Sequence, residues 1–381
     1  MLKFKGDLST WFIVFFLSLI SLLAVYSSTS TLAFKYQGGD TEYYFLKHTL
    51  LIIMSLGVMY IVHWLDFKIW ARISPLLLIA SFILLLYTLF QGQEYEINKA
   101  SRWINVLGQS FQPSDLAKFS LILYIARSFA VGNPPSTPKN LKTYATNVAI
   151  TLGICTLIAP TNLSTAILIF GCSLALLFFA GAPLRYILVT ILIGILVVTL
   201  LGINAQRRTT WKSRYEDYIA RLFDPNYQPN YQTQHANIAI VNGGLLGKGA
   251  GKSLQKNFLP HPYSDFVYAI IIEEYGFLFG ACTVLFLYIL LFFRCLIILK
   301  MSNSIFGSLC CLGLTFMIVA QAMVNMGVTV GLLPVTGLTL PMISMGGTSL
   351  LFTSLSLGII LSISRKALEE KKLLPPKEVV A

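Results

Sequence analysis

The chain has 381 residues, of which 56% are hydrophobic and 12% charged, and its formal net charge is +12. A soluble domain of this length could not bury so much apolar surface in one core, so the composition excludes an ordinary water-soluble globular protein. The apolar residues stand in long blocks with few charges. Such blocks predict helices that cross a lipid bilayer and satisfy their backbone hydrogen bonds internally.

Ten apolar blocks follow one another along the chain and predict an all-α, polytopic membrane protein with about ten transmembrane helices. They cover residues 11–33, 46–64, 69–90, 112–131, 142–160, 163–180, 184–204, 266–293, 305–325 and 346–363. The first block is too long for a secretory signal and lacks a small-residue cleavage site, so we expect a retained membrane helix. The fourth block is the weakest, since it contains Asp115 and Lys118.

The segments between the blocks carry basic residues asymmetrically. With the N-terminus in the cytoplasm, the short outer segments hold only Lys35, Lys47, Lys99 and Arg102, whereas the inner segments hold many more. Because basic residues are retained on the cytoplasmic side, the sequence predicts that both termini face the cytoplasm. We expect one membrane domain over residues 1–364 and a short basic cytoplasmic tail over residues 365–381.

Residues 205–265, between the seventh and eighth blocks, form a long loop that this topology places outside the membrane. Its acidic residues before Asp265 are Glu216, Asp217 and Asp224, and its basic residues are Arg207, Arg208, Lys212, Arg214, Arg221, Lys248, Lys252 and Lys256. Long loops are largely exempt from the charge rule, so the topology stands. The basic excess suits an anionic ligand such as a pyrophosphate, or anionic lipid; a merely solvated loop is the alternative.

Several charged residues stand where a membrane makes charge costly. Asp115 and Lys118 are three residues apart on a predicted helix and can pair, either beside a functional cavity or as a structural lock. Asp265 closes the long loop just before the eighth block, where it could act chemically or, with Ser264, simply cap the helix. Glu273 lies on the Asp265 side of that helix, and we expect it to be the partner of Asp265.

The stretch from Asn325 to Ser349 is rich in glycine and proline. It predicts broken backbone at membrane depth, which is tolerated only against protein or a water-filled cavity, and hence a re-entrant or lid-like segment; an ordinary loop is the alternative. The six cysteines lie in or beside apolar blocks without metal-type spacing, and the four histidines are scattered. Neither residue type therefore predicts a metal centre.

Four further stretches are specific through their order and spacing. They are Ala100–Ile104 with Gln112–Asp115 and Lys118; Pro160–Ala166; Asn242–Gly249 with Phe258–Pro260, Asp265–Phe266 and Glu273–Gly276; and Asn325 with Gly331–Gly337, Leu340–Pro341 and Ser344–Gly347. Together they resemble the SEDS family, the FtsW and RodA type of membrane protein, over essentially the whole chain. The family often has Asp where Asn162 stands, so we assign that residue no ionised role.

The resemblance implies a peptidoglycan glycosyltransferase that polymerises lipid II into glycan strands outside the bacterial cytoplasmic (inner) membrane and releases undecaprenyl pyrophosphate. It implies a class B penicillin-binding protein and other divisome membrane proteins as partners, and no nucleic acid. The stretch from Phe258 to Glu274 is more similar to FtsW, the division enzyme, than to RodA, the elongation enzyme. A RodA-like role, a lipid II flippase and a non-catalytic scaffold are the alternatives.

The resemblance also implies a catalytic role for Asp265, as the acid–base residue. We expect substrate contacts from twelve further positions: Arg102, Trp103, Asp115, Lys118, Arg208, Gly243, Gly244, Lys248, Glu273, Ser344, Gly346 and Gly347. Positive charge must stabilise a departing pyrophosphate, and Arg102, Arg208, Lys248 or a divalent cation, Mg or Mn, could supply it. No organic cofactor is expected.

Overall fold

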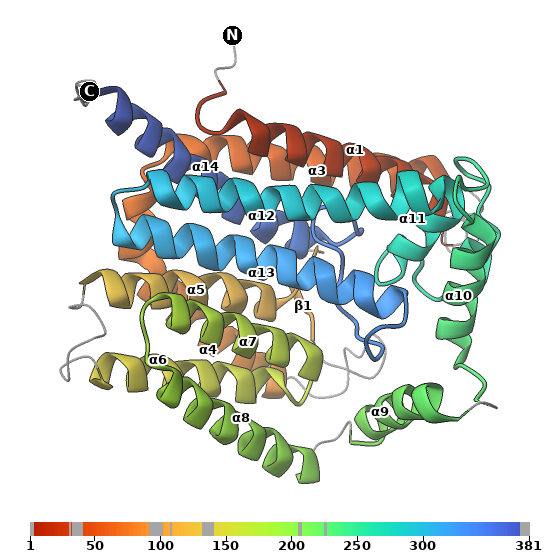
Figure 1. Ribbon diagram of the computed structural model, residues 1–381, viewed down its shortest axis with the longest axis horizontal. Helices are drawn as coiled ribbons and strands as arrows, with labels where there is room; N and C mark the ends of the chain where they lie inside the picture. Colours follow the sequence, from red (N-terminus) through yellow and green to blue (C-terminus); the bar gives the residue numbers. More distant parts are fainter. Residues whose placement is uncertain are drawn as a thin grey trace, which may run out of the picture.

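A computed structural model describes residues 4–29, 32, 41–90, 102–106, 109–131, 141–204, 208–224 and 227–373. Long helices lie side by side in a bundle, and the helices of the long loop lie across one end of it (Figure 1). The ten apolar blocks coincide with helices α1 (Leu8–Ser28), α3 (Thr41–Trp64), α4 (Phe67–Phe90), α5 (Pro113–Val131), α6 (Leu141–Ile158), α7 (Leu163–Phe179), α8 (Leu184–Asn204), α11 and α12 (Val267–Gly276 and Thr283–Met301), α13 (Ile305–Thr329) and α14 (Gly347–Leu373).

The prediction of a helical membrane protein is confirmed. Within the described part of the chain, seven helices are long and apolar enough to cross a membrane, with α11, the π-helix Phe277–Cys282 and α12 counted as one. Helices α7 and α8 are shorter apolar helices. Helix α5 is not among the seven because its 19 residues include the charged Asp115, Lys118 and Arg127. The exact number of spans therefore remains a prediction.

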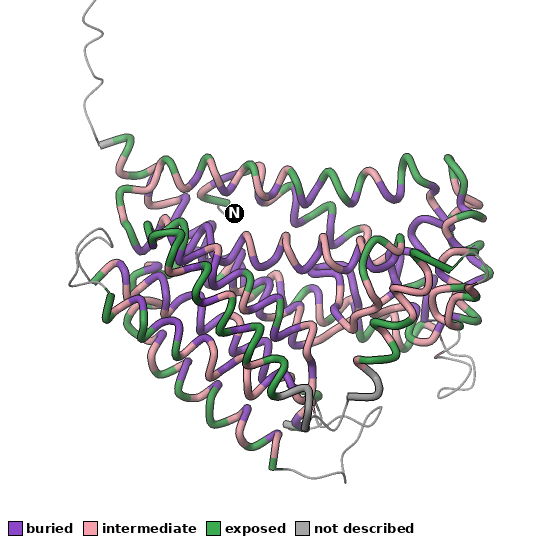
Figure 2. Tube along the Cα trace, turned by 60° about the horizontal axis from the view of Figure 1, so that its bottom comes forward, coloured by how far each residue is buried: buried purple, intermediate pink, exposed green. Residues whose placement is uncertain are grey.

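Helix α5 lies at the centre of the packing. It contacts α4, α13 and α7, and Leu121, Ile122 and Leu123 on it are wholly buried. Buried positions gather where helices face one another, and exposed positions lie along their outer sides (Figure 2). Many of those exposed side chains are large and apolar, such as Leu192 and Phe286. A bilayer would cover such a surface, whereas water would not stabilise it.

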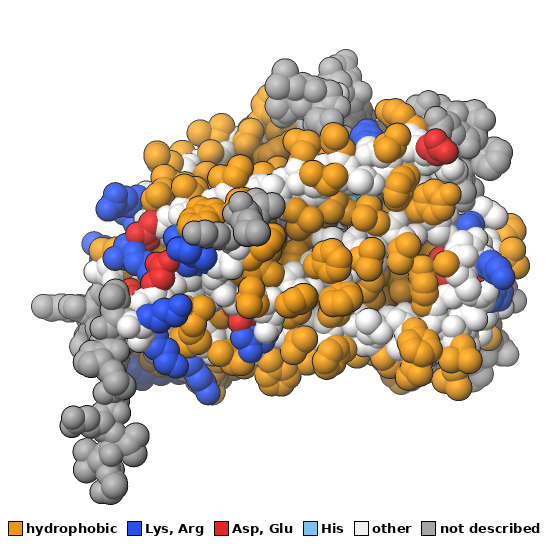
Figure 3. Space-filling view, turned by 90° about the horizontal axis from the view of Figure 1, so that it is seen from above, with side chains coloured by type: hydrophobic (Ala, Val, Ile, Leu, Met, Phe, Trp, Pro, Cys, Tyr) orange, Lys and Arg blue, Asp and Glu red, His pale blue; other side chains and the backbone are white. Residues whose placement is uncertain are grey.

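Both termini lie at the same end of the bundle. Lys5 Nζ lies 3.6 Å from Glu369 Oε1, and Arg294 pairs with Asp7. Charged side chains gather at this end in Figure 3, while hydrophobic side chains dominate the surface between the two ends. Helix α14 continues to Leu373, so the first nine residues of the predicted tail, 365–373, extend a membrane helix. The rest of that tail, 374–381, lies outside the described residues.

The long loop lies at the opposite end of the bundle and is largely helical (Figure 1). It contains α9 (Arg208–Phe223), α10 (Tyr231–Gly243) and the short 3-10 helix η3 (Gln255–Asn257). Helix α10 begins at the N-cap Asn230, whose side chain accepts from the Thr233 amide. Helix α9 is held against the segment after α13, where the Tyr218 hydroxyl donates to the Leu332 carbonyl at 2.9 Å. The loop is therefore a folded cover rather than an open chain.

A short β-hairpin is an exception to the all-α prediction. Strands β1 (Ile104–Val106) and β2 (Gln109–Phe111) pair antiparallel, with Ile104 opposite Phe111, immediately before α5. Its two strands are too short to give a sequence pattern with a clear period. The hairpin anchors Arg102 and Trp103, which directly precede β1.

Candidate active site

Asp265 stands in the turn just before α11. The Ser264 hydroxyl donates to Asp265 Oδ1 at 2.9 Å. Helix α11 has Phe266 at its N-cap position and no side-chain cap. The capping alternative for Ser264 and Asp265 is therefore wrong, since their side chains bond each other and not the helix end. The residue is half-buried, and its carboxylate is not used to cap the helix.

Burial and neighbouring charge act on Asp265 in opposite directions. Removal from water raises the pKa of the Asp265 carboxyl, and this effect exceeds the opposing hydrogen bond from Ser264 and the electrostatic effects of Arg102, His261 and Arg214. A Cβ placed on Gly337 would lie 3.6 Å from Arg102 Nη1 and 3.7 Å from Asp265 Oδ2. Arg102 therefore lies near the carboxylate, and its expected contact with the substrate stays a prediction.

The segment between α13 and α14 is irregular from residue 330 to 346, as the glycines and prolines predict. It is fastened to the turn that holds Asp265. The buried Ser344 donates its hydroxyl to the Ser264 carbonyl at 2.7 Å, and the Met345 amide donates to the Tyr263 carbonyl at 2.9 Å. The segment is therefore a fixed wall of the site in this conformation.

Asn325, on α13, joins the same two segments. Its side-chain amide donates to the Asp265 carbonyl at 2.8 Å and to the Leu338 carbonyl at 2.7 Å. One turn earlier on α13, Gln321 donates to the Thr339 carbonyl at 2.8 Å. Residues four apart lie on one face of a helix, so α13 presents two amides to two consecutive carbonyls. Both amides hold the wall against α13, and Asn325 also ties it to the Asp265 turn.

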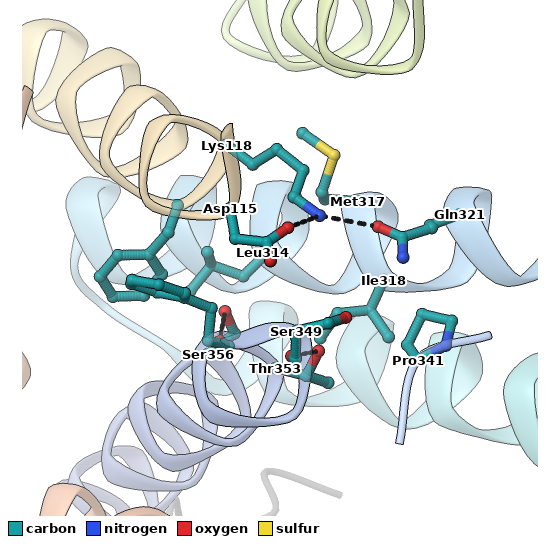
Figure 4. A pocket seen from close by; sticks show the side chains of 12 residues that line it. Asp115, Lys118, Leu314, Met317, Ile318, Gln321, Pro341, Ser349, Thr353 and Ser356 are labelled. Atoms are coloured by element: carbon teal, nitrogen blue, oxygen red, sulfur yellow. Dashed lines mark hydrogen bonds and ion pairs between the residues drawn. The ribbon is translucent and has the colours of Figure 1, made fainter. Parts of the chain in front are cut away.

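Asp115 and Lys118 pair as their spacing predicts (Figure 4). Lys118 Nζ lies 2.8 Å from Asp115 Oδ1, and the other carboxylate oxygen accepts from the Thr348 hydroxyl at 2.9 Å. Lys118 also donates to Gln321 Oε1 at 2.9 Å. The pair is therefore linked to the Asp265 turn through α13. Lys118 bonds Gln321 on that helix, and Asn325, one turn further along it, bonds the Asp265 carbonyl.

The cavity beside this pair is small. Its volume is about 30 Å³, and it is lined by side chains of α5, α13 and α14 together with Pro341 (Figure 4). A space of this size admits water rather than a lipid chain. A polyprenyl chain does not fit there in this conformation, so the geometry favours the structural interpretation of the Asp115–Lys118 pair.

Glu273 has partners other than Asp265, and the expected pairing of the two is wrong. Its carboxylate is wholly buried and accepts from the Ser253 hydroxyl and from the Gln255 amide at 3.1 Å. Lys248 Nζ, on the same loop, lies 3.4 Å from Glu273 Oε1. Since these groups all belong to the long loop, Glu273 holds that loop against α11 and does not line an open site.

The glycines of the loop explain how it comes so close to α11. A Cβ on Gly243 would lie 2.1 Å from the Ile272 carbonyl oxygen, and one on Gly247 would lie 2.2 Å from the Glu274 carbonyl oxygen. Gly247 also has φ +82°, which L side chains rarely adopt. The chain can pass there only without side chains. Gly243 thus packs against backbone, and the resemblance-based expectation of a substrate contact finds no support at this position.

The remaining predicted substrate-binding residues occupy different parts of this end. Trp103 is half-buried beside Arg102. Gly244 follows α10 with φ +53° and accepts a hydrogen bond from the Phe277 amide. Gly346 closes the irregular segment and Gly347 begins α14. Arg208 begins α9, but its side chain lies outside the described residues.

Three residues that the structure brings to Asp265 were not singled out from the sequence. Arg214 and His261 lie within electrostatic reach of the carboxyl, and Asn325 holds the backbone. Arg214 was one of many basic residues in the loop, and His261 was isolated in the sequence. Asn325 was noted as the start of a glycine-rich stretch and as part of a motif that carries the resemblance, but without a role of its own. No local pattern assigned these three residues to Asp265, because the fold alone brings them together.

A divalent cation remains a prediction. Among the described residues, no three His, Cys, Asp or Glu side chains come together as a metal-binding group. Within the part of the chain that the structure describes, the charged groups that act on the Asp265 carboxyl are basic side chains, which suit an anionic ligand better than a resident divalent metal.

A family model described as "Cell cycle protein", for FtsW, RodA and SpoVE, matches residues 7–369. The chain belongs to the FtsW/RodA/SpoVE family. It is 32% identical over 372 residues to stage V sporulation protein E of Bacillus subtilis, covering 95% of this chain and 98% of that relative. It is also 32% identical over 361 residues to a probable peptidoglycan glycosyltransferase FtsW of Geobacter metallireducens, covering 92% of each.

Solved structures of the FtsW/RodA/SpoVE family have the same fold. One, described as the structural coordination of polymerization and crosslinking by a peptidoglycan synthase complex, superposes with a TM-score of 0.74 at 26% identity, over 95% of this chain and 98% of that chain. The crystal structure of RodA from Thermus thermophilus superposes with a TM-score of 0.68 at 25% identity, over 95% of this chain and 97% of that chain.

Proposed function

We propose that this chain is a peptidoglycan glycosyltransferase that polymerises lipid II and releases undecaprenyl pyrophosphate. Family membership over residues 7–369 and relatives named peptidoglycan glycosyltransferase support the activity. The single structural observation that carries the proposal is the half-buried Asp265, set among Arg102, Arg214 and His261 at the end of the bundle that carries the long loop.

The chemistry of glycosyl transfer suits this arrangement. Asp265 takes the proton from the acceptor sugar 4-hydroxyl, whose oxygen then bonds the anomeric carbon of the growing chain as the bond to the pyrophosphate oxygen breaks. A positioned general base contributes roughly 10² to 10⁴ in rate. The cations beside the carboxylate favour its ionised form and are placed to stabilise the negative charge of the departing pyrophosphate.

The site lies at the outer face of the bacterial inner membrane, and both termini are cytoplasmic. The distribution of basic residues supports this topology. The position of both termini at one end and of the folded loop at the other agrees with it. The proposed partner is a class B penicillin-binding protein, together with other divisome membrane proteins, and the similarity to a solved peptidoglycan synthase complex supports that partner.

The role in the cell is septal wall synthesis. The relatives named FtsW, from Geobacter metallireducens and Enterococcus hirae, are 32% and 33% identical to the chain. The test is incubation of the purified chain and its penicillin-binding partner with fluorescent lipid II in detergent. Glycan polymer that lysozyme degrades would support the activity. No polymer, together with transbilayer movement of lipid II in vesicles, would support a flippase instead.

A further inference from the structure

Helix α13 ends in a turn that depends on glycine. The Gly331 amide donates to the Val328 carbonyl at 3.0 Å, and the Leu332 amide donates to the Gly327 carbonyl at 2.7 Å. These paired bonds form a Schellman motif, in which the residue just after the helix adopts positive φ. Gly331 has φ +77°, as the motif requires. The turn therefore gives the start of the wall, residues 330–346, a defined conformation.

Tyr218 and Arg221 join helix α9 to this turn. The Tyr218 hydroxyl donates to the Leu332 carbonyl at 2.9 Å. The guanidinium group of Arg221 lies over Gly331, where a Cβ would overlap it. The segment after α13 extends toward α9 (Figure 1). Gly331 thus ends α13 and also leaves space for the guanidinium group, and we call these two interactions of α9 the docking contacts.

The same face of α9 carries Arg214. Positions 214, 218 and 221 are four and three residues apart, so they lie in one stripe along the helix. All three residues are half-buried, whereas Lys212 and Tyr215, on other faces of α9, are exposed. Arg214 is one of the groups that act electrostatically on the Asp265 carboxyl and lower its pKa. The stripe that docks on α13 therefore also brings a cation to the proposed catalytic group.

Helix α13 is a common support for the two charged groups. Asn325, on α13, holds the Asp265 carbonyl, and the turn at the end of α13 holds the face of α9 that bears Arg214. A separate bond, from the Asn230 amide to the Asp217 carboxylate at 3.3 Å, ties α9 to the start of α10. The docking contacts thus fix Arg214 relative to Asp265 through one helix.

We propose, on the basis of the function proposed above, that Tyr218 and Arg221 are positioning residues for glycosyl transfer. Their contacts with the α13 turn hold Arg214 where it meets the pyrophosphate of a lipid substrate bound beside Asp265. A guanidinium group can donate two parallel hydrogen bonds to phosphate oxygens, but only when it is held in the right orientation. Tyr218 and Arg221 contact the protein and act on the substrate through Arg214.

The test is a binding titration of the purified full-length chain in detergent. The probes are farnesyl pyrophosphate, a short polyprenyl pyrophosphate, and farnesol, which lacks the charge. The docking variant is Tyr218→Phe/Arg221→Gln. The matched control is Lys212→Gln/Tyr215→Phe, which removes one charge and one hydroxyl from exposed residues of the same helix. Arg214→Gln is measured alone and combined with the docking variant, and polymerisation of lipid II is followed on the same preparations.

Arg214→Gln should bind farnesyl pyrophosphate about tenfold more weakly than the wild type, since it loses a charge-assisted hydrogen bond. The docking variant should bind it about fivefold more weakly, because Arg214 is in place for a smaller fraction of the time. Combined with Arg214→Gln, the docking variant should cause no further loss. The control, and farnesol binding throughout, should be unchanged. Tyr218→Phe alone, with an expected loss of about threefold, is measured in case the double variant does not fold.

A loss in the docking variant that persists when Arg214 is already replaced would overturn the proposal. Equal losses in the docking variant and the control, or equal losses for farnesol, would do the same, because they indicate a general structural effect. A wild-type chain that binds both probes equally would also overturn it. The predicted binding pattern without glycan formation would contradict the proposed activity but support the positioning of Arg214. Glycan formation without that pattern would do the reverse.

Discussion

The side-chain amide of Asn325 donates to the backbone carbonyl of Asp265 across 60 residues of sequence, at a distance of 2.8 Å. The same amide holds the Leu338 carbonyl, so one buried group joins the proposed catalytic turn to the wall formed by residues 330–346. Asn325 touches the backbone of Asp265 and not its carboxylate. We therefore regard it as a positioning residue.

Replacement of Asn325 by Leu should lower kcat about tenfold or more, with little change in KM. Two buried carbonyls would lose their donor, at a cost of about 1–3 kcal/mol, and the turn would become free to shift. Thr329→Ala is the control, because its hydroxyl donates only to the Asn325 carbonyl on the same helix. Polymerisation of lipid II measures both variants, and equal effects would refute a positioning role.

The acid side of the pH–rate profile should reflect Asp265. Burial raises the pKa of this carboxyl, and a general base must be ionised. Activity should therefore fall, as pH decreases, at a higher pH than for an exposed aspartate. Arg102→Gln removes a charge that lowers this pKa, so it should move the fall to higher pH still. Lys212→Gln, with a side chain 70% exposed on α9, should leave the profile in place. An unmoved profile in Arg102→Gln would contradict the assignment.

The Asp115–Lys118 pair can be tested by a double-mutant cycle. Lys118→Met leaves a buried carboxylate without its cation and should destabilise the protein by about 3 kcal/mol, since breaking a buried pair costs about 3–5 kcal/mol. Asp115→Asn combined with Lys118→Met should cost less than the sum of the two single changes. Thermal unfolding in detergent measures the cycle. Additive effects would show that the two side chains do not stabilise the bundle as a pair.

The passage of the long loop over α11 should tolerate no side chain at Gly247. Its Cβ would lie 2.2 Å from a backbone carbonyl oxygen, so Gly247→Ala should lower the free energy of unfolding by about 3 kcal/mol or more. Gly171→Ala is the control, because nothing lies within 4 Å of the new Cβ on α7. A melting temperature for Gly247→Ala equal to that of the wild type would show that the loop does not pack in this way.

The helical bundle could be predicted from sequence because a helix that spans the lipid must be apolar along its length, so each span is visible as an apolar block. The Asp115–Lys118 pair was predictable too, because its partners lie three residues apart on one helix. The partners of Glu273 were not, since they come from a loop some 20 residues earlier, and helix geometry alone wrongly suggested Asp265. The resemblance singled out Asn162 only because the family often has Asp at that position. In the structure Asn162 caps α7 with its side-chain oxygen, a role that needs no charge.

The most direct test of the proposed mechanism is polymerisation of labelled lipid II by Asp265→Asn, purified with the penicillin-binding partner. Asparagine keeps nearly the same shape but cannot take a proton at neutral pH, so the variant should insert, fold and bind its partner while forming no measurable glycan. Wild-type protein in parallel should form long strands. Strand formation by Asp265→Asn at the wild-type rate would contradict the account.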